Sequence, residues 1–469
     1  MLRLLDTATG VAVPPAERAG ARVGLYVCGA TVYGPPHIGH GRFALVYDVL
    51  RRYLARSGYD VRHVSNITDV DDKVIDRAAA EGRDWREVAE EAEEQWWAAM
   101  DAMGVLRPHE VPHATDYVEE MVSLVAELVR LGVAYETSDG VYLACDAVEG
   151  YGTLAHQSLD SLRSGARAVV GEEKRSPLDF AVWKKAKPGE PTWPSPFGPG
   201  RPGWHTECVV MSLSLLGEGF ELHGGGLDLV FPHHENERAQ AVALGRPFAR
   251  HWVHNGLVVV GGEKMSKSLG NYTELKTLLD AYDPRAYRLL VLRSYYRSPL
   301  EVGPSTLGDA AAALQRVDEL ARRLEAVRPR QDTVPRGWDA PGGQSRPAAV
   351  FPAAQSLRGR FVEAMDDDLG TPRALAEVLG AVREANRLLD AGEATGALAL
   401  GDVALELLGV LGIEPAGVEA PPATIVELAG RRESARRAGD YGAADRLRDE
   451  LAAQGWKVDD LPDGPRLHR

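Results

Sequence analysis

The stretch RVGLYVCGATVYGPPHIGH, residues 22–40, decides the fold of this 469-residue chain. Its first half is a short, mostly apolar run, which is typical of a buried strand. Glycine and two prolines then make a turn, and residues 39–57 carry apolar side chains at helical spacing. A second apolar run at residues 61–67 completes a strand–helix–strand unit. This unit predicts an α/β fold built on a doubly wound parallel sheet.

Apolar spacing also predicts the elements on either side of a Gly- and Pro-rich region that ends near residue 203. Before and within that region we expect helices at residues 85–103 and 115–131 and a strand at 141–143. After it we expect a helix at 207–216, a strand at 220–223, a helix at 232–244 and a strand at 251–260. Near the end of the chain, residues 371–391 should form a helix with Thr371 as its N-cap and Pro372 at the first position.

Composition places the chain among multi-domain globular proteins, since 45% of its residues are hydrophobic and 26% are charged. No apolar run is long enough to span a bilayer, and residues 1–10 lack the order of a secretory signal. Three cysteines indicate a reducing compartment rather than a disulfide framework, so a cytoplasmic, soluble protein is expected. The net charge of −15 excludes an overtly basic nucleic-acid binder, although one basic face would suffice to bind RNA.

The motif PHIGH, residues 36–40, lies where the first strand meets its helix. A helix N-terminus attracts anions, and Gly39 allows close approach to the backbone. His37 and His40 can donate hydrogen bonds to a phosphoryl group as its charge redistributes. The alternative is a pair of surface histidines at a turn.

A second motif indicates a triphosphate. KMSKS, residues 264–268, follows a strand and a Gly-Gly turn, so Lys264 and Lys267 can clamp a triphosphate from a mobile loop. Together with PHIGH, in this order and on this sheet pattern, it favours a nucleotide site. The run GGGLD, residues 224–228, follows a strand, and taken alone it is read as a tight turn.

Four residues form a set that suits zinc: Cys28, Cys208, His233 and Glu237. Thiolate, imidazole and carboxylate are zinc ligands, and His233 and Glu237 share one face of the expected helix. We therefore expect one zinc per chain. Each residue has an ordinary alternative as a packed cysteine or a helix pair, and the third cysteine, Cys145, is assigned to packing.

With these motifs the chain resembles the class I aminoacyl-tRNA synthetases, and more closely the cysteinyl-tRNA synthetases. The segments that carry the closer resemblance are YVCG at 26–29, NITDVDDK at 66–73, GWHTEC at 203–208 and FPHHENE at 231–237. The resemblance runs from residue 25 to about 302, through much of the helical region and into the tail. It implies that Mg-ATP activates L-cysteine, that the product is transferred to the tRNA for cysteine, and that the protein is a monomer without membrane contact.

The resemblance also implies roles for particular residues. His37 and His40 would stabilise the phosphoryl transition state, and Lys264 with Lys267 would hold pyrophosphate. The remaining assignments are Gly39, Gly225 and Asp228 for ATP, and Gly29, Thr68 and Trp204 for cysteine, whose thiol the zinc would take. Thr68 could equally end a strand, and Trp204 could be a core aromatic. Four protein ligands would require five-coordinate zinc or departure of Glu237 when the thiol binds.

Together these features predict five parts. The two halves of a nucleotide-binding catalytic domain are residues 1–110 and 204–303, and an inserted connective region at 111–203 lies between them. A helical domain at 304–420 contains a Pro- and Gly-rich linker at 328–352, and residues 421–469 form a small anticodon-recognition module. The tail resembles the family's anticodon module through arginines at 431, 432, 436, 437, 446 and 448. Interspersed acids leave a solvated helical pair as the alternative. Residues 366–372 depart from the family's usual Phe-Asn before Thr-Pro, and residues 463–469 lack its terminal aromatic.

Two rival functions remain open. One is a related ligase of thiol-cofactor biosynthesis that couples cysteine to an amino-sugar, although its chain would end soon after the helical region. The other is a non-catalytic RNA-binding or regulatory paralogue, which the intact signature motifs disfavour. Exchange between ATP and pyrophosphate separates the enzymes from the paralogue.

Overall fold

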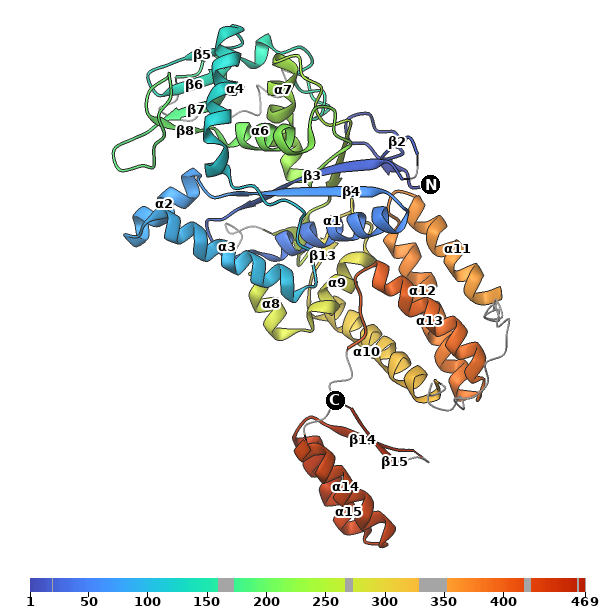
Figure 1. Cartoon of the computed structure of the whole chain (residues 1–469). Coiled ribbons are helices and arrows are strands. Elements are labelled where there is room, and N and C mark those ends of the chain that lie inside the picture. Colours follow the sequence, from blue (N-terminus) through green and yellow to red (C-terminus); the bar gives the residue numbers. More distant parts are fainter. Residues whose placement is uncertain are drawn as a thin grey trace, which may run out of the picture.

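A parallel four-stranded sheet forms the centre of the protein in a computed structural model of the chain (Figure 1). The structure describes residues 1–18, 20–158, 173–265, 273–328, 352–416, 423–461 and 464–468. The sheet has the order β10-β9-β3-β4, made of β10 (His251–Asn255), β9 (Leu222–Gly226), β3 (Arg22–Thr31) and β4 (Asp60–Thr68). All neighbouring strands are parallel. The expected α/β fold is therefore confirmed.

The strand–helix–strand unit forms as the sequence predicts. Helix α1 (Ile38–Arg56) connects β3 to β4 and buries Leu45, Val49 and Leu50 against the sheet. The chain moves from β3 to β4 on one side, and from β9 to β10 on the other. The order therefore reverses between β3 and β9, and ligands of such sheets bind at this crevice, outside the carboxyl ends of the strands.

Helices cover both faces of the sheet, and each face has its own core. One core includes α1, α3 (Trp85–Ala102) and the later helical bundle. The other includes α4 (Val118–Arg130), α6 (Trp204–Leu216) and residues of α7 (Glu235–Ala243). The short α2 (Asp72–Glu81) follows β4 directly.

The region between the two halves of the sheet has a sheet of its own. It is antiparallel, in the order β5 (Ala134–Glu136), β6 (Gly140–Leu143), β7 (Phe180–Lys185) and β8 (Gly200–Pro202). Short 3-10 turns stand at Ala114–Tyr117 and Cys145–Ala147. Strands β6 and β7 bury Val141, Leu143 and Val182 in the second core, which joins this region to α4 and α6.

A helical bundle follows the sheet. After β11 (Val258–Val260), β12 (Glu263–Lys264), α8 (Leu275–Ala281), α9 (Pro284–Arg293) and β13 (Leu300–Glu301), the bundle comprises α10 (Pro304–Val327), α11 (Pro352–Asp366), α12 (Thr371–Asp390) and α13 (Ala394–Val410). Arg288 of α9 is fully buried; its guanidinium lies 2.6 Å from Asp48 of α1 and donates to the Leu411 carbonyl after α13. The bundle is thus fastened to the sheet domain.

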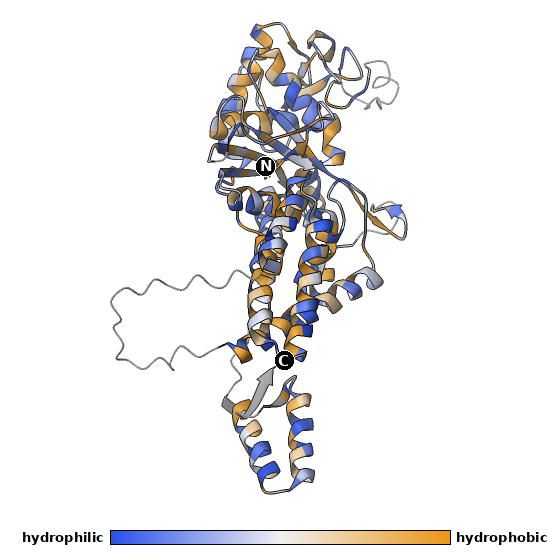
Figure 2. Ribbon diagram, turned by 90° about the vertical axis from the view of Figure 1, so that its right-hand side faces the viewer, coloured by the Kyte–Doolittle hydropathy of each residue, from blue (hydrophilic) through white to orange (hydrophobic). Residues whose placement is uncertain are grey.

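The ends of the chain carry small units. A hairpin of β1 (Leu4–Leu5) and β2 (Ala12–Val13) begins it. The tail has α14 (Ala423–Arg437), α15 (Tyr441–Ala453), β14 (Lys457–Leu461) and β15 (Gly464–His468), around a separate core of Ile425, Leu428, Ala429, Leu451 and Trp456. Figure 2 shows polar and apolar residues alternating along the helices of the bundle and tail. No described helix is both long and apolar enough to cross a membrane.

Several predicted boundaries are wrong. The expected strand at 251–260 is two strands in different sheets. Gly256 lies between them against the carbonyls of Arg297 and Ser298, where no side chain fits. The expected helix at 232–244 begins with a π-helical turn, Val230–His234, before α7. Helix α6 begins at Trp204 rather than at 207.

Two further differences concern glycines. The expected strand at 220–223 begins later and runs through the glycines to Gly226, so the glycine run is strand rather than turn. Gly370, not Thr371, is the N-cap of α12, and Thr371 is its first residue. Residues 329–351, most of the expected linker, lie outside the described residues.

Candidate functional site

A cleft of about 400 Å³ opens at the carboxyl ends of β3 and β9. It contains residues of both sheet halves, as the reversal of strand order predicts. Those that bear on the expected chemistry are Cys28, Gly29, His37, Gly39, His40, Trp204, Gly226, Asp228 and Met265. The cleft therefore gathers segments that lie more than two hundred residues apart in the chain.

The start of α1 forms one end of this cleft. His37 is the N-cap, its Nδ1 accepts the backbone N–H of His40, and the Nδ1 of His40 accepts the N–H of His37, each at 3.3 Å. The two rings stack with centroids 3.6 Å apart. Because each Nδ1 accepts a hydrogen bond, a neutral ring must carry its proton on Nε2 and can donate there. A side chain at Gly39 would meet the His37 ring at 2.9 Å, which explains the glycine.

The glycines of β9 lie in close contact with the rings of neighbouring side chains. A β-carbon at Gly224 would meet the Tyr47 ring at 2.3 Å, and one at Gly225 would meet His234 at 2.5 Å. The Tyr47 hydroxyl donates to the carbonyl of Gly225 at 2.8 Å. Gly226 and Asp228 face the cleft. Gly225, expected at the nucleotide, is not among the described residues that line the cleft, and it packs against the buried His234 ring instead.

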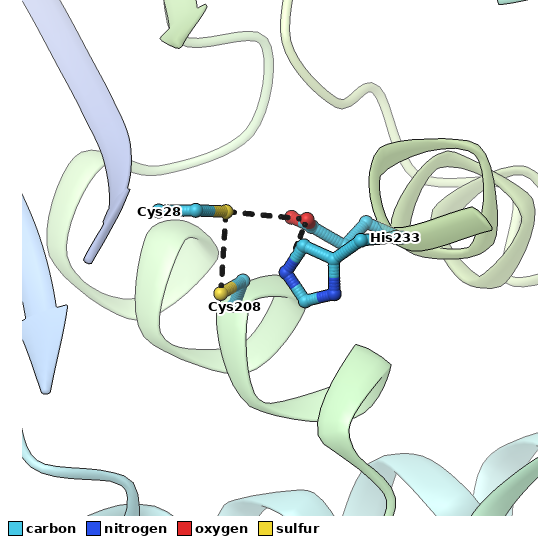
Figure 3. A group of neighbouring side chains, drawn as sticks. Cys28, Cys208 and His233 are labelled. Carbon is cyan, nitrogen blue, oxygen red and sulfur yellow. Dashed lines mark hydrogen bonds and ion pairs between the residues drawn. The ribbon is translucent and has the colours of Figure 1, made fainter. Parts of the chain in front are cut away.

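The four residues expected to bind metal meet in one buried cluster (Figure 3). Cys28 comes from β3, Cys208 from α6, His233 from the π-helical turn and Glu237 from α7. The Cys28 sulfur lies 3.5 Å from that of Cys208 and 3.4 Å from Glu237 Oε1, and His233 Nε2 lies 3.1 Å from the same oxygen. All four ligand atoms lie within 4.8 Å of one another. Such a group could hold a metal ion.

Burial sets the protonation of this cluster when no cation is bound. It raises the pKa of the Cys28 thiol well above its usual value and raises that of Cys208, and it lowers the pKa of His233 well below its usual value. Burial thus favours neutral thiols and a neutral imidazole. A bound cation reverses this preference for the thiols, because thiolates are then paired with positive charge.

A second layer of histidines orients the cluster. His223 Nε2 lies 2.8 Å from Glu237 Oε2, and His205 Nδ1 lies 2.9 Å from His233 Nδ1. The Trp204 ring stacks on His233 with centroids 4.1 Å apart. His223 and His234 can also join Cys28 and Glu237 in an alternative ligand group.

The residues expected at the amino acid differ in position. Gly29 and Trp204 line the cleft. A side chain at Gly29 would collide with the carbonyl of Asn66, whose side-chain oxygen accepts the Gly29 N–H at 2.9 Å. Thr68 is buried and donates its hydroxyl to Glu207 at 2.7 Å, so it supports the cleft from behind.

Known proteins are similar to this chain over nearly its whole length. The family model described as "tRNA synthetases class I (C) catalytic domain" matches residues 16–312, and that of the DALR domain matches residues 360–414. The cysteine–tRNA ligase of Solidesulfovibrio magneticus is 43% identical, with 99% of each chain covered. That of Nitratidesulfovibrio vulgaris is 45% identical, covering 94% of this chain and 95% of its own. The chain belongs to the cysteine–tRNA ligase family.

Membership makes the chain an enzyme, a ligase of the aminoacyl-tRNA synthetase class. Among solved structures, methionyl-tRNA synthetase of Mycobacterium tuberculosis in complex with methionyl-adenylate has a TM-score of 0.61 at 18% identity, covering 83% of this chain and 90% of its own. At that identity the likeness concerns the fold alone. It supports a class I synthetase core followed by a helical region.

The sequence-predicted residues of this synthetase thus fall into three groups. His37, His40 and Cys28 line one cleft, the other three residues of the metal set meet Cys28 in the buried cluster, and Thr68 lies behind the cleft. The side chain of Lys264, and Lys267 entirely, lie outside the described residues. Sequence reasoning missed Tyr47, Glu207 and His223, although GWHTEC and the histidine before the glycine run stood beside residues that it singled out.

Proposed function

We propose that the chain activates L-cysteine with Mg-ATP and transfers it to the tRNA for cysteine. The observation that carries the proposal is that Cys28 belongs both to the metal cluster and to the lining of the cleft that contains His37 and His40. A thiol-binding group and a phosphate-binding helix start therefore share one space. The names of the relatives agree with this chemistry.

The donor set of the cluster fits zinc. Thiolate, imidazole and carboxylate are zinc ligands, and the four ligand atoms lie within 4.8 Å of one another. Cys28, Cys208, His233 and Glu237 would hold the ion, with His223 and His205 orienting two of them.

The first step needs no nucleophile from the enzyme. An oxygen of the cysteine carboxylate attacks the α-phosphorus of ATP, the bond to the β-phosphate bridging oxygen breaks, and pyrophosphate leaves. The Nε2–H groups of His37 and His40 can donate to the phosphoryl oxygens as charge builds there. Gly39, Gly225 and Asp228 are proposed to bind the nucleotide, and Lys264 and Lys267 the departing pyrophosphate.

The second step transfers the acyl group. A hydroxyl of the terminal ribose of tRNA attacks the cysteinyl carbonyl, the ester bond forms, AMP leaves with the electrons of its bond, and the hydroxyl proton passes to the phosphate of AMP or to solvent. Selection of cysteine would come from zinc, which binds a thiolate well and a serine hydroxyl poorly. Such a bond separates isosteres more widely than shape alone can. Gly29 and Trp204 would line the amino-acid pocket.

The tail favours the tRNA-charging function over that of the amino-sugar ligase. An amino-sugar ligase would end soon after the helical region, whereas the cysteine–tRNA ligase of Solidesulfovibrio magneticus matches 99% of this chain. The arginine-bearing α14 and α15 are proposed to recognise the anticodon end. The tail therefore favours tRNA as the acceptor.

The deciding experiment is ATP–pyrophosphate exchange with cysteine, with serine as the matched control. The proposal requires exchange with cysteine and at least about a hundredfold less with serine. Charging of the cysteine tRNA in the same preparation tests the second step. Exchange without charging would favour the amino-sugar ligase, and no exchange would favour the non-catalytic paralogue.

A further inference from the structure

One cationic side chain in the cleft is not used by the chemistry above. Among the described residues that line the cleft, Lys73 is the one lysine or arginine. It is the second residue of α2, and it is exposed. Its ammonium lies 5.0 Å from the centroid of the Tyr33 ring, which also lines the cleft. Tyr33 belongs to the loop that leads from β3 to His37. The Lys73 ammonium therefore lies near the end of the cleft where His37 and His40 are proposed to contact the phosphates.

The carboxylates nearest in sequence to Lys73 have other partners. Asp71 caps α2 by accepting the backbone N–H of Lys73 at 3.0 Å. Asp72 pairs with Lys184 of β7 at 2.5 Å and with Arg201 of β8. Within the described ranges no carboxylate pairs with the Lys73 ammonium. These contacts fix the start of α2 against the inserted region and leave the charge of Lys73 for a ligand.

The same helix also holds Tyr33. Arg77 lies one turn after Lys73, and residues four apart share a helix face. Arg77 Nη1 donates to the Tyr33 carbonyl at 3.1 Å. The backbone of Tyr33 is therefore held by the helix that carries Lys73. A cation held over an aromatic face without a carboxylate partner remains available to an anion.

We propose that the Lys73 ammonium binds a non-bridging phosphate oxygen of ATP. This inference rests on the proposed function and adds a residue to it. The start of α1 offers backbone N–H groups and two imidazoles, whereas ATP brings several negative charges. A lysine acts as a point charge with three donors, which suits phosphate oxygens. A phosphodiester of the tRNA acceptor end has the same chemistry, but the cleft that Lys73 lines is the one that contains His37 and His40.

The test uses full-length Lys73→Gln and Lys73→Arg, with Lys276→Gln as the matched control. Lys276 is an exposed lysine of α8 whose ammonium pairs with Asp280 at 2.6 Å. The dissociation constant for ATP is measured by tryptophan fluorescence, since Trp96 and Trp204 line the cleft. Cysteine-dependent exchange is measured over a range of ATP and cysteine concentrations.

Loss of one charge-assisted hydrogen bond should weaken ATP binding by on the order of tenfold or more. Lys73→Gln should therefore raise both the dissociation constant and the KM for ATP by that factor and leave the KM for cysteine unchanged. Lys73→Arg should stay within about threefold of wild type because the charge is kept. Lys276→Gln should match wild type.

Other results separate the possibilities. Unchanged ATP binding and exchange in Lys73→Gln would overturn the proposal. If, in addition, transfer from preformed adenylate to tRNA were weakened, the cation would be assigned to the acceptor end instead. If wild type bound ATP but showed no exchange with cysteine, the proposed function would fail, and weaker ATP binding by Lys73→Gln would still support this contact.

Discussion

The sulfur atoms of Cys28 and Cys208 lie 3.5 Å apart, although 180 residues separate the two cysteines in the chain. That distance is far longer than a disulfide bond, of about 2.05 Å, and it suits two ligands of one ion. Cys28 stands on the first half of the sheet and Cys208 on the helix that begins the second half. Both halves of the sheet domain therefore contribute to one site, although the inserted region separates them in the chain.

Purified protein should contain about one zinc per chain. Cys208→Ser should lower the zinc content because a hydroxyl is a poor replacement for a thiolate. Cys145→Ser is the matched control, since Cys145 is buried and donates to the Leu178 carbonyl, away from the cluster. Elemental analysis of protein prepared without chelator checks this. Equal zinc in both variants would mean that Cys208 is not a ligand.

Replacing His40 should slow exchange by on the order of a hundredfold or more, as for loss of a transition-state donor. The structure offers two variants that separate this role from capping. His40→Asn keeps a polar group near the Nδ1 position that accepts the His37 N–H, but loses the donor at Nε2. His40→Ala loses both.

Exchange should therefore fall alike in both His40 variants, while thermal melting should fall more in His40→Ala. Cysteine binding should survive in each. Near-normal exchange in His40→Asn would assign His40 to capping alone. Lys267→Ala should slow exchange by a similar factor, since Lys267 of the KMSKS motif is proposed to hold the departing pyrophosphate.

A chain that ends at Ala420 should keep cysteine-dependent exchange and lose most of its tRNA charging. The tail has its own core around Leu451 and Trp456, so its removal should not expose the cores of the sheet domain. The loss should appear as weaker tRNA binding, with a flatter dependence on salt. Charging by full-length and truncated protein at two salt concentrations measures this. Equal charging would show that α14 and α15 are not needed for recognition.

Acidification below pH 6.5 should destabilise the protein through His63 of β4. This side chain is 7% exposed, and burial, with smaller contributions from Arg51 and His109, lowers its pKa from 6.5 to about 3. The unfolded chain then binds more protons between pH 3 and 6.5. The stabilisation is complete above pH 6.5 and is lost as pH falls, by about 1.4 kcal/mol per unit.

Urea unfolding of wild type and His63→Leu at pH 7.5 and 5.5 tests this contribution. Wild type should lose about 1.4 kcal/mol more of its free energy of unfolding than the variant does over this interval. Both proteins share every other titrating group, so the comparison isolates His63. Equal losses would show that His63 can be protonated in the folded protein at little cost.

Local pattern predicted the first half of the fold well, because a short apolar strand, a turn and a helix each follow from adjacent residues. It failed where tertiary contacts decide. Gly256 separates β10 from β11 at a point where the carbonyls of Arg297 and Ser298 leave no room for a side chain, and both carbonyls are distant in sequence. The glycines at 224 and 225 pack against the Tyr47 and His234 rings, which local pattern cannot show.

The candidate site shows the same division. Cys28, Cys208, His233 and Glu237 were predicted as a set from their chemistry together with a resemblance, and the structure brings them into one cluster. Their ligand role stays a prediction. His223 could not be assigned from sequence, since a lone histidine has no pattern, and its relation to Glu237 exists only once β9 packs beside α7.

The buried pair of Arg288 and Asp48 limits where this chain can be divided. Neither side chain is accessible to solvent, and removing one partner of a buried ion pair leaves an uncompensated charge. The guanidinium also meets the end of the last bundle helix through Leu411. A chimaera that took its bundle from a relative would also need the matching faces of α1 and α9 from the same relative. The tail is not part of this buried pair. A chimaera of two relatives should therefore fold when the junction lies after the bundle and be destabilised when the junction lies before it.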